Sequence, residues 1–272
     1  MSLSKSRAGD RIPPNAAPVE LRHADKIATQ TLSFYDYSRA NYRLLLDKDE
    51  LVALLVLLEP GQAIPLHVHE VDKAIHVYTG VAAVNLEDGA KELVRSDSVF
   101  VPASSAIGLK NSADQECRLL FFFPCGPFES LAFRKPADQP ERSATRIHCI
   151  RADSVAWENW DGPLLRPEDS PLAWRTLIDT DQMVLGVTKI DPGHDVDSHY
   201  HRQTQIILFS GGEGKTHIQG GHYEPVREMS YIYPPPYCIH HSINTSPTEP
   251  LLEVYFFPTG PFSSVDYLFD GA

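Results

Sequence analysis

Short apolar segments run along most of the chain, and turn-forming residues interrupt them about every ten positions. Examples are ELVALLVLLEPG, KAIHVYTG and VAAVNLEDG in the N-terminal half and MVLGVTKIDPG and QTQIILFSGG in the C-terminal half. These segments are rich in the aliphatic and aromatic residues that favour strands. Nothing between them sustains the period of an amphipathic helix. The pattern predicts an all-β protein, an antiparallel sandwich or barrel with a few short helices.

The pattern also repeats itself, which indicates an internal duplication. YRLLLDKD beginning at Tyr42 matches WRTLIDTD beginning at Trp174 (174 − 42 = 132), and FFPCGPF matches FFPTGPF at a slightly larger offset (256 − 122 = 134). The first offset also relates two pairs of histidines, His67 and His69 to His199 and His201. We conclude that the chain contains two copies of one module.

Composition suggests where the copies begin and end. Residues 1–20 are poor in apolar side chains and contain three prolines, which predicts a flexible N-terminal arm. The polar stretch RKPADQPERSATR has the character of a linker between domains. The predicted organisation is therefore an arm at 1–20, an N-terminal barrel at 21–135, a linker at 136–146 and a C-terminal barrel at 147–272.

Two histidines one residue apart carry the clearest candidate chemistry. In a strand, residues i and i+2 point to the same face, so the side chains of His199 and His201 are expected to enter one space. Gln205 lies four residues further on, and His240 could reach the same space from a neighbouring strand. Imidazole is the commonest protein ligand for transition metals, so the pattern predicts a metal site in the second copy.

The spacing of these residues resembles that of the cupin family, and the whole chain resembles a bicupin. The first cupin motif, G-x(5)-H-x-H-x(3,4)-E-x(6)-G, is matched by Gly193, His199, His201, Gln205 and Gly212, with glutamine in the glutamate position. The second motif is matched by Pro235, His240 and Asn244, with Tyr237 in place of a glycine. In the first copy, Lys73 replaces the glutamate and Ile107 replaces the last histidine. The resemblance implies two tandem double-stranded β-helix (jelly-roll) barrels and a degenerate metal site in the first.

The two copies therefore differ in the ligands that they offer to a metal. His199, His201, His240 and the amide oxygen of Gln205 suit one divalent ion, with iron favoured and zinc, nickel, manganese or copper as alternatives. Gln205 either binds this ion directly or hydrogen-bonds a water on it. In the first copy, an ammonium group would repel a dication, so His67 and His69 are interpreted as remnants of a site or as members of an inter-domain contact.

Family analogy suggests the function. The leading prediction is a mononuclear non-haem iron dioxygenase that acts on a small chelating substrate, including aromatic ones, in the C-terminal barrel. The alternatives are a non-redox isomerase, cyclase or decarboxylase that uses zinc, nickel or manganese, and a non-catalytic metal-binding or ligand-binding cupin. Glu253, Tyr255 and Cys238 are the candidate catalytic residues, because they make the second barrel more polar than the first or share a face with His240. For Glu253, a solvated position at a sheet edge is an equal alternative.

Charge and hydropathy limit the partners. With 24 basic and 36 acidic residues, the net charge of −12 argues against nucleic-acid binding. The longest apolar run, LVALLVLL at 51–58, is far shorter than the ~20 residues of a membrane-spanning helix and is interpreted as a buried strand. No secretory signal is recognisable, so a cytoplasmic location is expected. A small-molecule substrate and a homodimer formed through edge strands are the expected partners.

Overall fold

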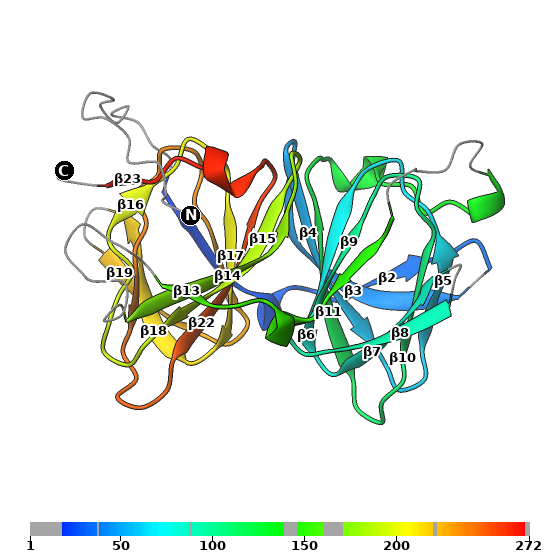
Figure 1. Ribbon diagram of the computed structural model, residues 1–272, viewed down its shortest axis with the longest axis horizontal. Coiled ribbons are helices and arrows are strands. Elements are labelled where there is room, and N and C mark those ends of the chain that lie inside the picture. Colours follow the sequence, from blue (N-terminus) through cyan, green and yellow to red (C-terminus); the bar gives the residue numbers. More distant parts are fainter. Residues whose placement is uncertain are drawn as a thin grey trace. The chain divides into compact units, whose positions relative to one another are not determined.

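The computed structural model describes residues 18–36, 38–86, 89–138, 146–159, 171–219 and 222–269. Antiparallel strands dominate these residues, and the helices among them are 3₁₀ turns of three residues (Figure 1). These turns are η1 (Ala24–Lys26), η2 (Phe128–Ser130), η3 (Pro136–Asp138), η4 (Ala152–Ser154) and η6 (Phe262–Ser264). The prediction of an all-β fold with a few short helices is confirmed. Within the described ranges, none of the helices is long and apolar enough to cross a membrane.

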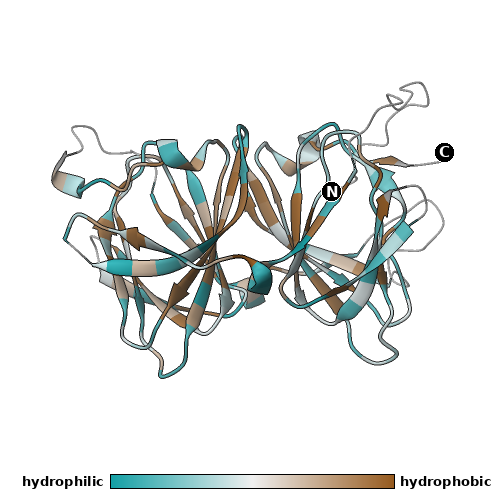
Figure 2. Cartoon of the chain, turned by 180° about the vertical axis from the view of Figure 1, so that it is seen from behind, coloured by the Kyte–Doolittle hydropathy of each residue, from teal (hydrophilic) through white to brown (hydrophobic). Residues whose placement is uncertain are grey.

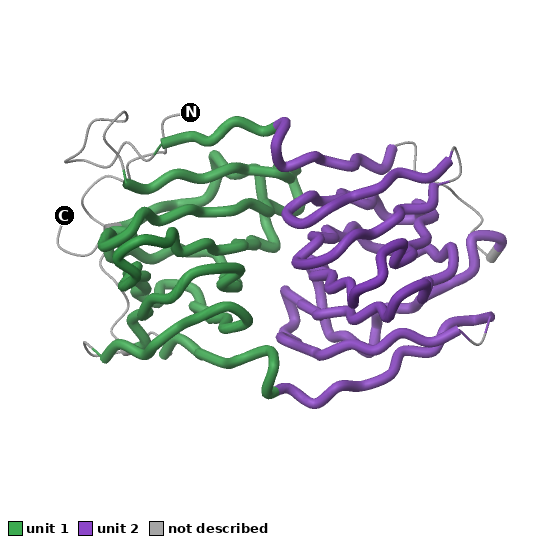
Figure 3. The backbone as a smooth tube through the Cα atoms, turned by 90° about the horizontal axis from the view of Figure 1, so that it is seen from below, with its two compact units in different colours: residues 1–26, 155–272 green, residues 27–154 purple. Residues whose placement is uncertain are grey.

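The chain forms two compact units whose limits differ from the predicted barrels (Figure 3). The first unit contains residues 27–154, and the second contains residues 1–26 together with 155–272. The difference arises because two short strands pair with the other copy. Strand β1 (Glu20–His23) pairs with β20 (Ser230–Tyr233) of the second unit, and β12 (His148–Ile150) pairs with β9 (Ser98–Val101) of the first.

These two pairings correct the expected boundaries at both ends. Residues 21–26 do not belong with the N-terminal barrel, and residues 147–154 do not belong with the C-terminal one. The end of the predicted arm is ordered, because Val19 is 3% exposed and its backbone N–H donates to the carbonyl of Ile218 at 3.2 Å. Residues 1–17 of the arm and 139–145 of the predicted linker lie outside the described residues.

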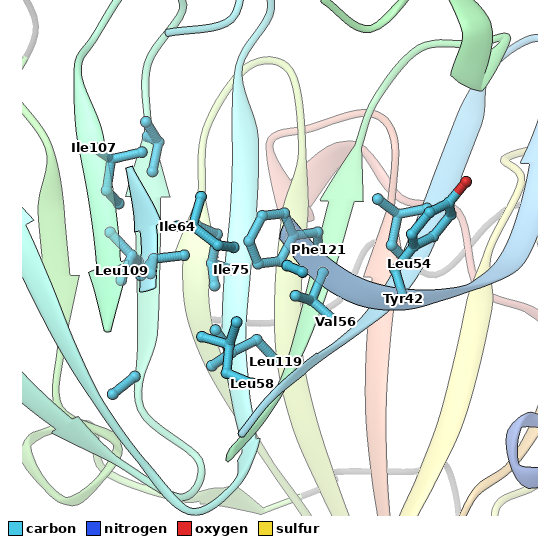
Figure 4. Packing of buried hydrophobic residues seen from close by; sticks show 14 of the residues in the cluster. Tyr42, Leu54, Val56, Leu58, Ile64, Ile75, Ile107, Leu109, Leu119 and Phe121 are labelled. Atoms are coloured by element: carbon cyan, nitrogen blue, oxygen red, sulfur yellow. The ribbon is translucent and has the colours of Figure 1, made fainter. Parts of the chain in front are cut away.

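The first unit encloses an apolar core between two sheets, with strand orders β12-β9-β6-β11-β4-β3-β2 and β5-β10-β7-β8 among the described residues. Apolar residues gather along these strands (Figure 2), and both sheets supply the core, for instance Leu54 and Phe121 from one and Ile64 and Leu109 from the other (Figure 4). The further strands of this unit are β2 (Gln30–Ser33), β3 (Arg39–Lys48), β4 (Leu51–Leu58), β5 (Ala63–His67), β6 (Lys73–Thr79), β7 (Val81–Leu86), β8 (Gly89–Val94), β10 (Ile107–Asn111) and β11 (Cys117–Phe123). Every residue of β4 is buried, as the apolar run at 51–58 predicts.

The second unit repeats this arrangement around its own core. Its larger described sheet has the order β1-β20-β17-β22-β15-β14-β13, and two smaller sheets have the orders β19-β18-β21 and β16-β23. Their bounds are β13 (Glu158–Asn159), β14 (Leu172–Asp179), β15 (Val184–Ile190), β16 (His199–Tyr200), β17 (Ile206–Gly211), β18 (Glu213–Gln219), β19 (His222–Arg227), β21 (Ser242–Asn244), β22 (Leu251–Phe257) and β23 (Leu268–Phe269). Residues on β14, β15, β17, β20 and β22 form one buried cluster.

Matching hydrogen bonds confirm the duplication at the level of single side chains. The amide of Asn111 donates to the carbonyls of Leu58 and Gln115 at 2.8 and 2.7 Å. The amide of Asn244 donates to the equivalent carbonyls of Ile190 and Glu249, both at 2.9 Å. The asparagine of the second motif therefore ties a turn to a neighbouring strand in each unit, which is a structural role.

Removing residues 1–26 is expected to destabilise the second unit, although this segment is remote from it in sequence. The deletion would remove β1 from its pairing with β20 and expose the core that Val19 and Ala24 cover, at 3% and 0% exposure. We expect a loss of about 3 kcal/mol or more in the free energy of unfolding, measured by denaturant titration. A chain that begins at Pro18 keeps β1 and serves as the control. Equal stability of the two truncated chains would contradict this role.

Candidate metal centre

An antiparallel bridge between two segments brings the predicted histidines together. His199 opens β16 and pairs with His240, with its N–H donating to the His240 carbonyl at 3.2 Å and the reverse bond at 2.9 Å. His201 follows two positions after His199, on the same side. One ring nitrogen from each of the three residues lies within 4.8 Å of the others. Within the described residues, this is the one group of three or more His, Cys, Asp or Glu side chains that could hold an ion.

Hydrogen bonds at the back of each ring orient the histidines towards a common point. The Nδ1 atoms of His199, His201 and His240 donate to the carbonyls of Asp197, Asp266 and Cys238 at 2.7, 2.9 and 3.0 Å. This fixes the tautomer, so each Nε2 carries a lone pair. Among the described residues, the buried Nε2 atoms of His201 and His240 have no hydrogen-bond partner. Such buried, unsatisfied acceptors are costly unless a ligand satisfies them.

Burial keeps these imidazoles neutral. It lowers the pKa of His199 to about 4, while the Asp197 carbonyl opposes that shift. Burial and the neighbouring imidazoles lower the pKa of His201 and His240 well below the ordinary value. A neutral imidazole is the form that binds a metal, so protons do not compete for the three Nε2 atoms near neutral pH.

Gln205 has the position that the sequence predicts for a fourth ligand. It directly precedes β17, its side chain is 4% exposed, and its Oε1 has no hydrogen-bond partner in the described part of the chain. Three imidazoles and one amide oxygen form a neutral donor set that fits a borderline divalent ion. The residues present therefore fit a metal, and direct ligation by Gln205 stays a prediction.

A cavity opens beside this cluster in the second unit. Its volume is about 50 Å³. Its polar lining consists of Thr188, His199, Gln205 and Glu253. Its aromatic and aliphatic lining consists of Leu172, Trp174, Val196, Ile207, Tyr255, Phe262 and Tyr267.

Glu253 is a buried acid in this cavity, which overturns the alternative of a solvated position at a sheet edge. It lies on β22, which is flanked by β15 and β17, and it is 4% exposed. Its Oε1 finds no hydrogen-bond partner among the described residues. Burial raises the pKa of Glu253 to about 7, although a hydrogen bond with Ser242 opposes this rise. Both protonation states are therefore accessible near neutral pH.

The other two candidate catalytic residues have different surroundings. Tyr255 lines the cavity, and its hydroxyl lies 3.3 Å from that of Thr176, while burial raises its pKa far above the ordinary value. Gly186 leaves room for this ring, because a Cβ there would clash with the Tyr255 hydroxyl. Cys238 is buried in the apolar cluster, its thiol points to the Ile239 carbonyl at 3.8 Å, and it is not part of the cavity lining.

Sequence reasoning missed Tyr267, whose ring covers the histidines. It stacks on His199 with centroids 5.3 Å apart and meets His201 edge-on at 4.4 Å. The duplication contained the necessary signal, since Tyr267 corresponds to Phe133 (267 − 134 = 133). Phe133 packs on His67 and His69 in the same way, at 5.2 and 4.3 Å.

The first unit holds a lysine where the second offers ligands. The Nζ of Lys73 lies 2.8 Å from Nε2 of His67, and Lys73 is 1% exposed. Burial lowers the pKa of Lys73 well below its ordinary value. Ile107 pairs with His67 as His240 pairs with His199, so a sec-butyl group stands at the third position. That this unit binds no metal stays a prediction.

Comparison with known proteins agrees with this architecture. The family described as "Cupin domain" matches residues 54–123, within the first unit. The first unit therefore contains a segment that matches a cupin domain. The chain is 28% identical over 136 residues to the dimethylsulfoniopropionate lyase DddW of Ruegeria pomeroyi, a match that covers 48% of this chain and 85% of that protein.

Two solved structures have a fold similar to that of this chain. One is a protein of Nostoc punctiforme provisionally assigned as a dioxygenase, with a TM-score of 0.72, 15% identity and coverage of 93% of this chain and 87% of that one. The other is the oxalate decarboxylase of Bacillus subtilis, studied for its Mn(II) centres, with a TM-score of 0.61, 14% identity and coverage of 91% and 79%. At such identities the likeness concerns the fold.

Proposed function

We propose that this cupin is a metal-dependent enzyme in which Glu253 exchanges a proton with a small substrate in the cavity of the second unit. One observation carries the proposal: a buried carboxyl group with an unpartnered oxygen, as far as the described residues go, lines the same cavity as His199 and Gln205. Enzymes place carboxyl groups in such apolar surroundings so that they can both accept and donate a proton near neutral pH.

The chain's own residues have separable tasks in this reaction. A divalent ion held by His199, His201 and His240, with Gln205 as ligand or as partner of a water, would polarise a substrate carboxylate or carbonyl and acidify the adjacent C–H group. Glu253 accepts that proton when ionised and returns it when neutral. Tyr267 covers the imidazoles and excludes water from one side of them.

This chemistry corresponds to the non-redox alternative, which includes isomerases, cyclases and decarboxylases, and it extends to eliminations. The relative from Ruegeria pomeroyi is named a lyase, which supports the same class. The iron dioxygenase stays a prediction that uses the same ligands with oxygen as a second substrate. Iron stays the favoured metal in that prediction, with zinc, nickel, manganese or copper as alternatives.

Proton exchange measured without oxygen tests the proposal. The full-length protein would be reconstituted anaerobically with Fe(II), Mn(II), Ni(II) or Zn(II) and incubated in ²H₂O with propionate, 3-hydroxypropionate or acetoacetate. We expect NMR to detect deuterium at the carbon beside the carboxylate or carbonyl, and Glu253→Gln to abolish this exchange. Glu249→Gln, which alters an exposed acid, is the matched control. Turnover that requires oxygen would favour the dioxygenase, and metal binding without exchange would favour a non-catalytic binding protein.

We also propose that the substrate is a small molecule and that the chain forms a homodimer through edge strands of its sheets. Unpaired strand edges are the usual sites of such pairing. Sedimentation at micromolar concentration is expected to show a dimer, and a single monomeric species would contradict it.

A further inference from the structure

We infer that Ser242 is a positioning residue for Glu253: its hydroxyl group holds the carboxyl group so that one carboxyl oxygen faces the cavity of the second unit. The inference rests on the proposed function in one respect, namely that Glu253 exchanges a proton with a substrate. Ser242 is not among the described residues that line the cavity. It therefore acts through Glu253 and not on the substrate.

Ser242 and Glu253 come from two different sheets of the second unit. Ser242 begins β21 in the sheet β19-β18-β21, and Glu253 lies within β22 of the larger sheet. Both residues are 4% exposed, and the Ser242 hydroxyl hydrogen-bonds the Glu253 carboxyl group. Within the described part of the chain, Oε1 of Glu253 has no partner. The hydrogen bond thus fixes one side of the carboxyl group and leaves Oε1 available to a substrate.

The first unit has an apolar pair at the same two positions. Ser242 corresponds to Leu109 (242 − 133 = 109), and Glu253 corresponds to Leu119 (253 − 134 = 119). Both leucines are 0% exposed and belong to the apolar core of that unit. A buried polar residue is costly without a hydrogen-bond partner, so replacing both leucines together is far less costly than replacing either alone. The paired replacement favours a direct interaction between Ser242 and Glu253.

A third polar residue follows the same pattern. Thr188 pairs with Glu253 across β15 and β22, and its counterpart Val56 (188 − 132 = 56) pairs with Leu119. Thr188 lines the cavity, whereas Val56 belongs to the apolar core of the first unit. The second unit therefore has a connected polar group where the first has a connected apolar one, which favours a shared task for these residues.

The Ser242 hydroxyl has two effects on the buried acid. It donates to the carboxyl group and so favours the ionised form, which opposes the rise in the pKa of Glu253 that burial causes. It also restricts rotation of the side chain, so that the reacting oxygen keeps its direction. Burial lowers the pKa of His199 and raises the pKa of Tyr255 and of Tyr267, so these three side chains of the lining are neutral near pH 7. Glu253 is the group of the described lining that changes its charge there.

A double-mutant cycle tests the contact without reference to activity. Ser242→Ala would be introduced into the full-length protein and into Glu253→Gln, and unfolding in urea would be followed at pH 5 and pH 8. Without the hydroxyl, the pKa of Glu253 in the folded chain rises further above that of the unfolded chain, so the penalty appears where the carboxyl group ionises. We expect Ser242→Ala to raise the unfolding constant about fivefold more at pH 8 than at pH 5. In Glu253→Gln, the effect should be equal at both pH values.

A buried serine on another strand supplies the matched control. Ser210→Ala alters a buried residue of β17 that is not among the described residues of the cavity lining, and its effect should not vary with pH. A penalty of Ser242→Ala that is the same at both pH values, or that varies with pH equally in Glu253→Gln, would overturn the inference.

Deuterium exchange separates positioning from packing. Ser242→Ala should lower the exchange rate at pH 7 at least about tenfold and move the limb of the pH–rate profile that reports ionisation of Glu253 upward by about one pH unit. Ser242→Thr keeps the hydroxyl and should retain at least about half the rate, and Ser210→Ala should change neither quantity. If Ser242→Thr is impaired as much as Ser242→Ala, or if the limb does not move, the hydroxyl has no positioning role.

The two measurements also separate this inference from the proposed function. A pH-dependent penalty in a protein that exchanges no deuterium would support the contact between Ser242 and Glu253 and contradict the reaction. Exchange that is lost in Glu253→Gln but unchanged in Ser242→Ala would support the reaction and overturn the positioning role.

Discussion

Replacing His240 by alanine is expected to abolish metal binding by the second unit. His240 is one of the three histidines whose ring nitrogens lie within 4.8 Å of one another, and it comes from a different segment than His199 and His201. Its loss leaves two imidazoles and one amide, too few ligands for a stable site. We expect the metal content to fall from about one ion per chain to less than about a tenth of an ion per chain. Loss of a residue that hydrogen-bonds a ligand lowers metal affinity about 10–100-fold, and loss of a direct ligand lowers it further.

The first unit provides the control for this experiment. His69→Ala removes a buried histidine from the equivalent position and should leave the metal content unchanged. Elemental analysis of protein purified without added metal gives the content, and circular dichroism shows whether each variant is folded. If His69→Ala releases as much metal as His240→Ala, or if His240→Ala keeps its metal, the assignment of the site to the second unit fails.

The local pattern was sufficient for predicting the fold class and the histidine cluster. The alternation of apolar and polar residues, together with the turn-forming residues, indicates where each strand lies to within a few positions. A repeat of 132 residues then relates the strands of one copy to those of the other (199 − 67 = 132). The pairing of β1 with β20 and of β12 with β9 was not predictable in this way. Both copies offer edges of the same kind, so which copy a short strand joins depends on the three-dimensional path of the chain.

The environment of a side chain was harder to predict than its position. Glu253 could be placed on a strand, but its burial depends on flanking strands that are distant in sequence. Cys238 was expected to share a face with His240, because side chains alternate along a strand. The segment that contains both residues is not a continuous strand, so this alternation does not apply. Tyr267 lies beyond both motifs, and only a comparison of the two copies could have indicated its contact with the histidines.

Replacing Glu253 by glutamine is expected to stabilise the metal-free protein at neutral and alkaline pH while it abolishes activity. The folded protein holds the pKa of Glu253 at about 7, above the 4.5 of the unperturbed group. Between these values the folded chain binds a proton that the unfolded chain releases, so this residue lowers stability as the pH rises from about 4.5 to about 7. At ~1.4 kcal/mol for each pH unit, the loss amounts to about 3 kcal/mol above pH 7.

Glutamine keeps the shape of the side chain and cannot ionise, so it avoids this loss. We expect the stability difference between Glu253→Gln and the unaltered protein to be small at pH 4.5 and to grow to about 3 kcal/mol in favour of the variant at pH 8, measured by urea denaturation. The rate of proton exchange should fall by about 10²–10⁴. Glu249→Gln should change neither quantity, because that acid is exposed. A stability difference that does not vary with pH would mean that Glu253 is ionised at the same pH in the folded and unfolded chains. If the variant exchanges protons as fast as the unaltered protein, this carboxyl group takes no part in the reaction. Burial of Glu253 destabilises the fold, and the same burial raises the pKa that lets this carboxyl group exchange a proton near neutral pH. A destabilising acid can therefore be retained at this position because the reaction requires it.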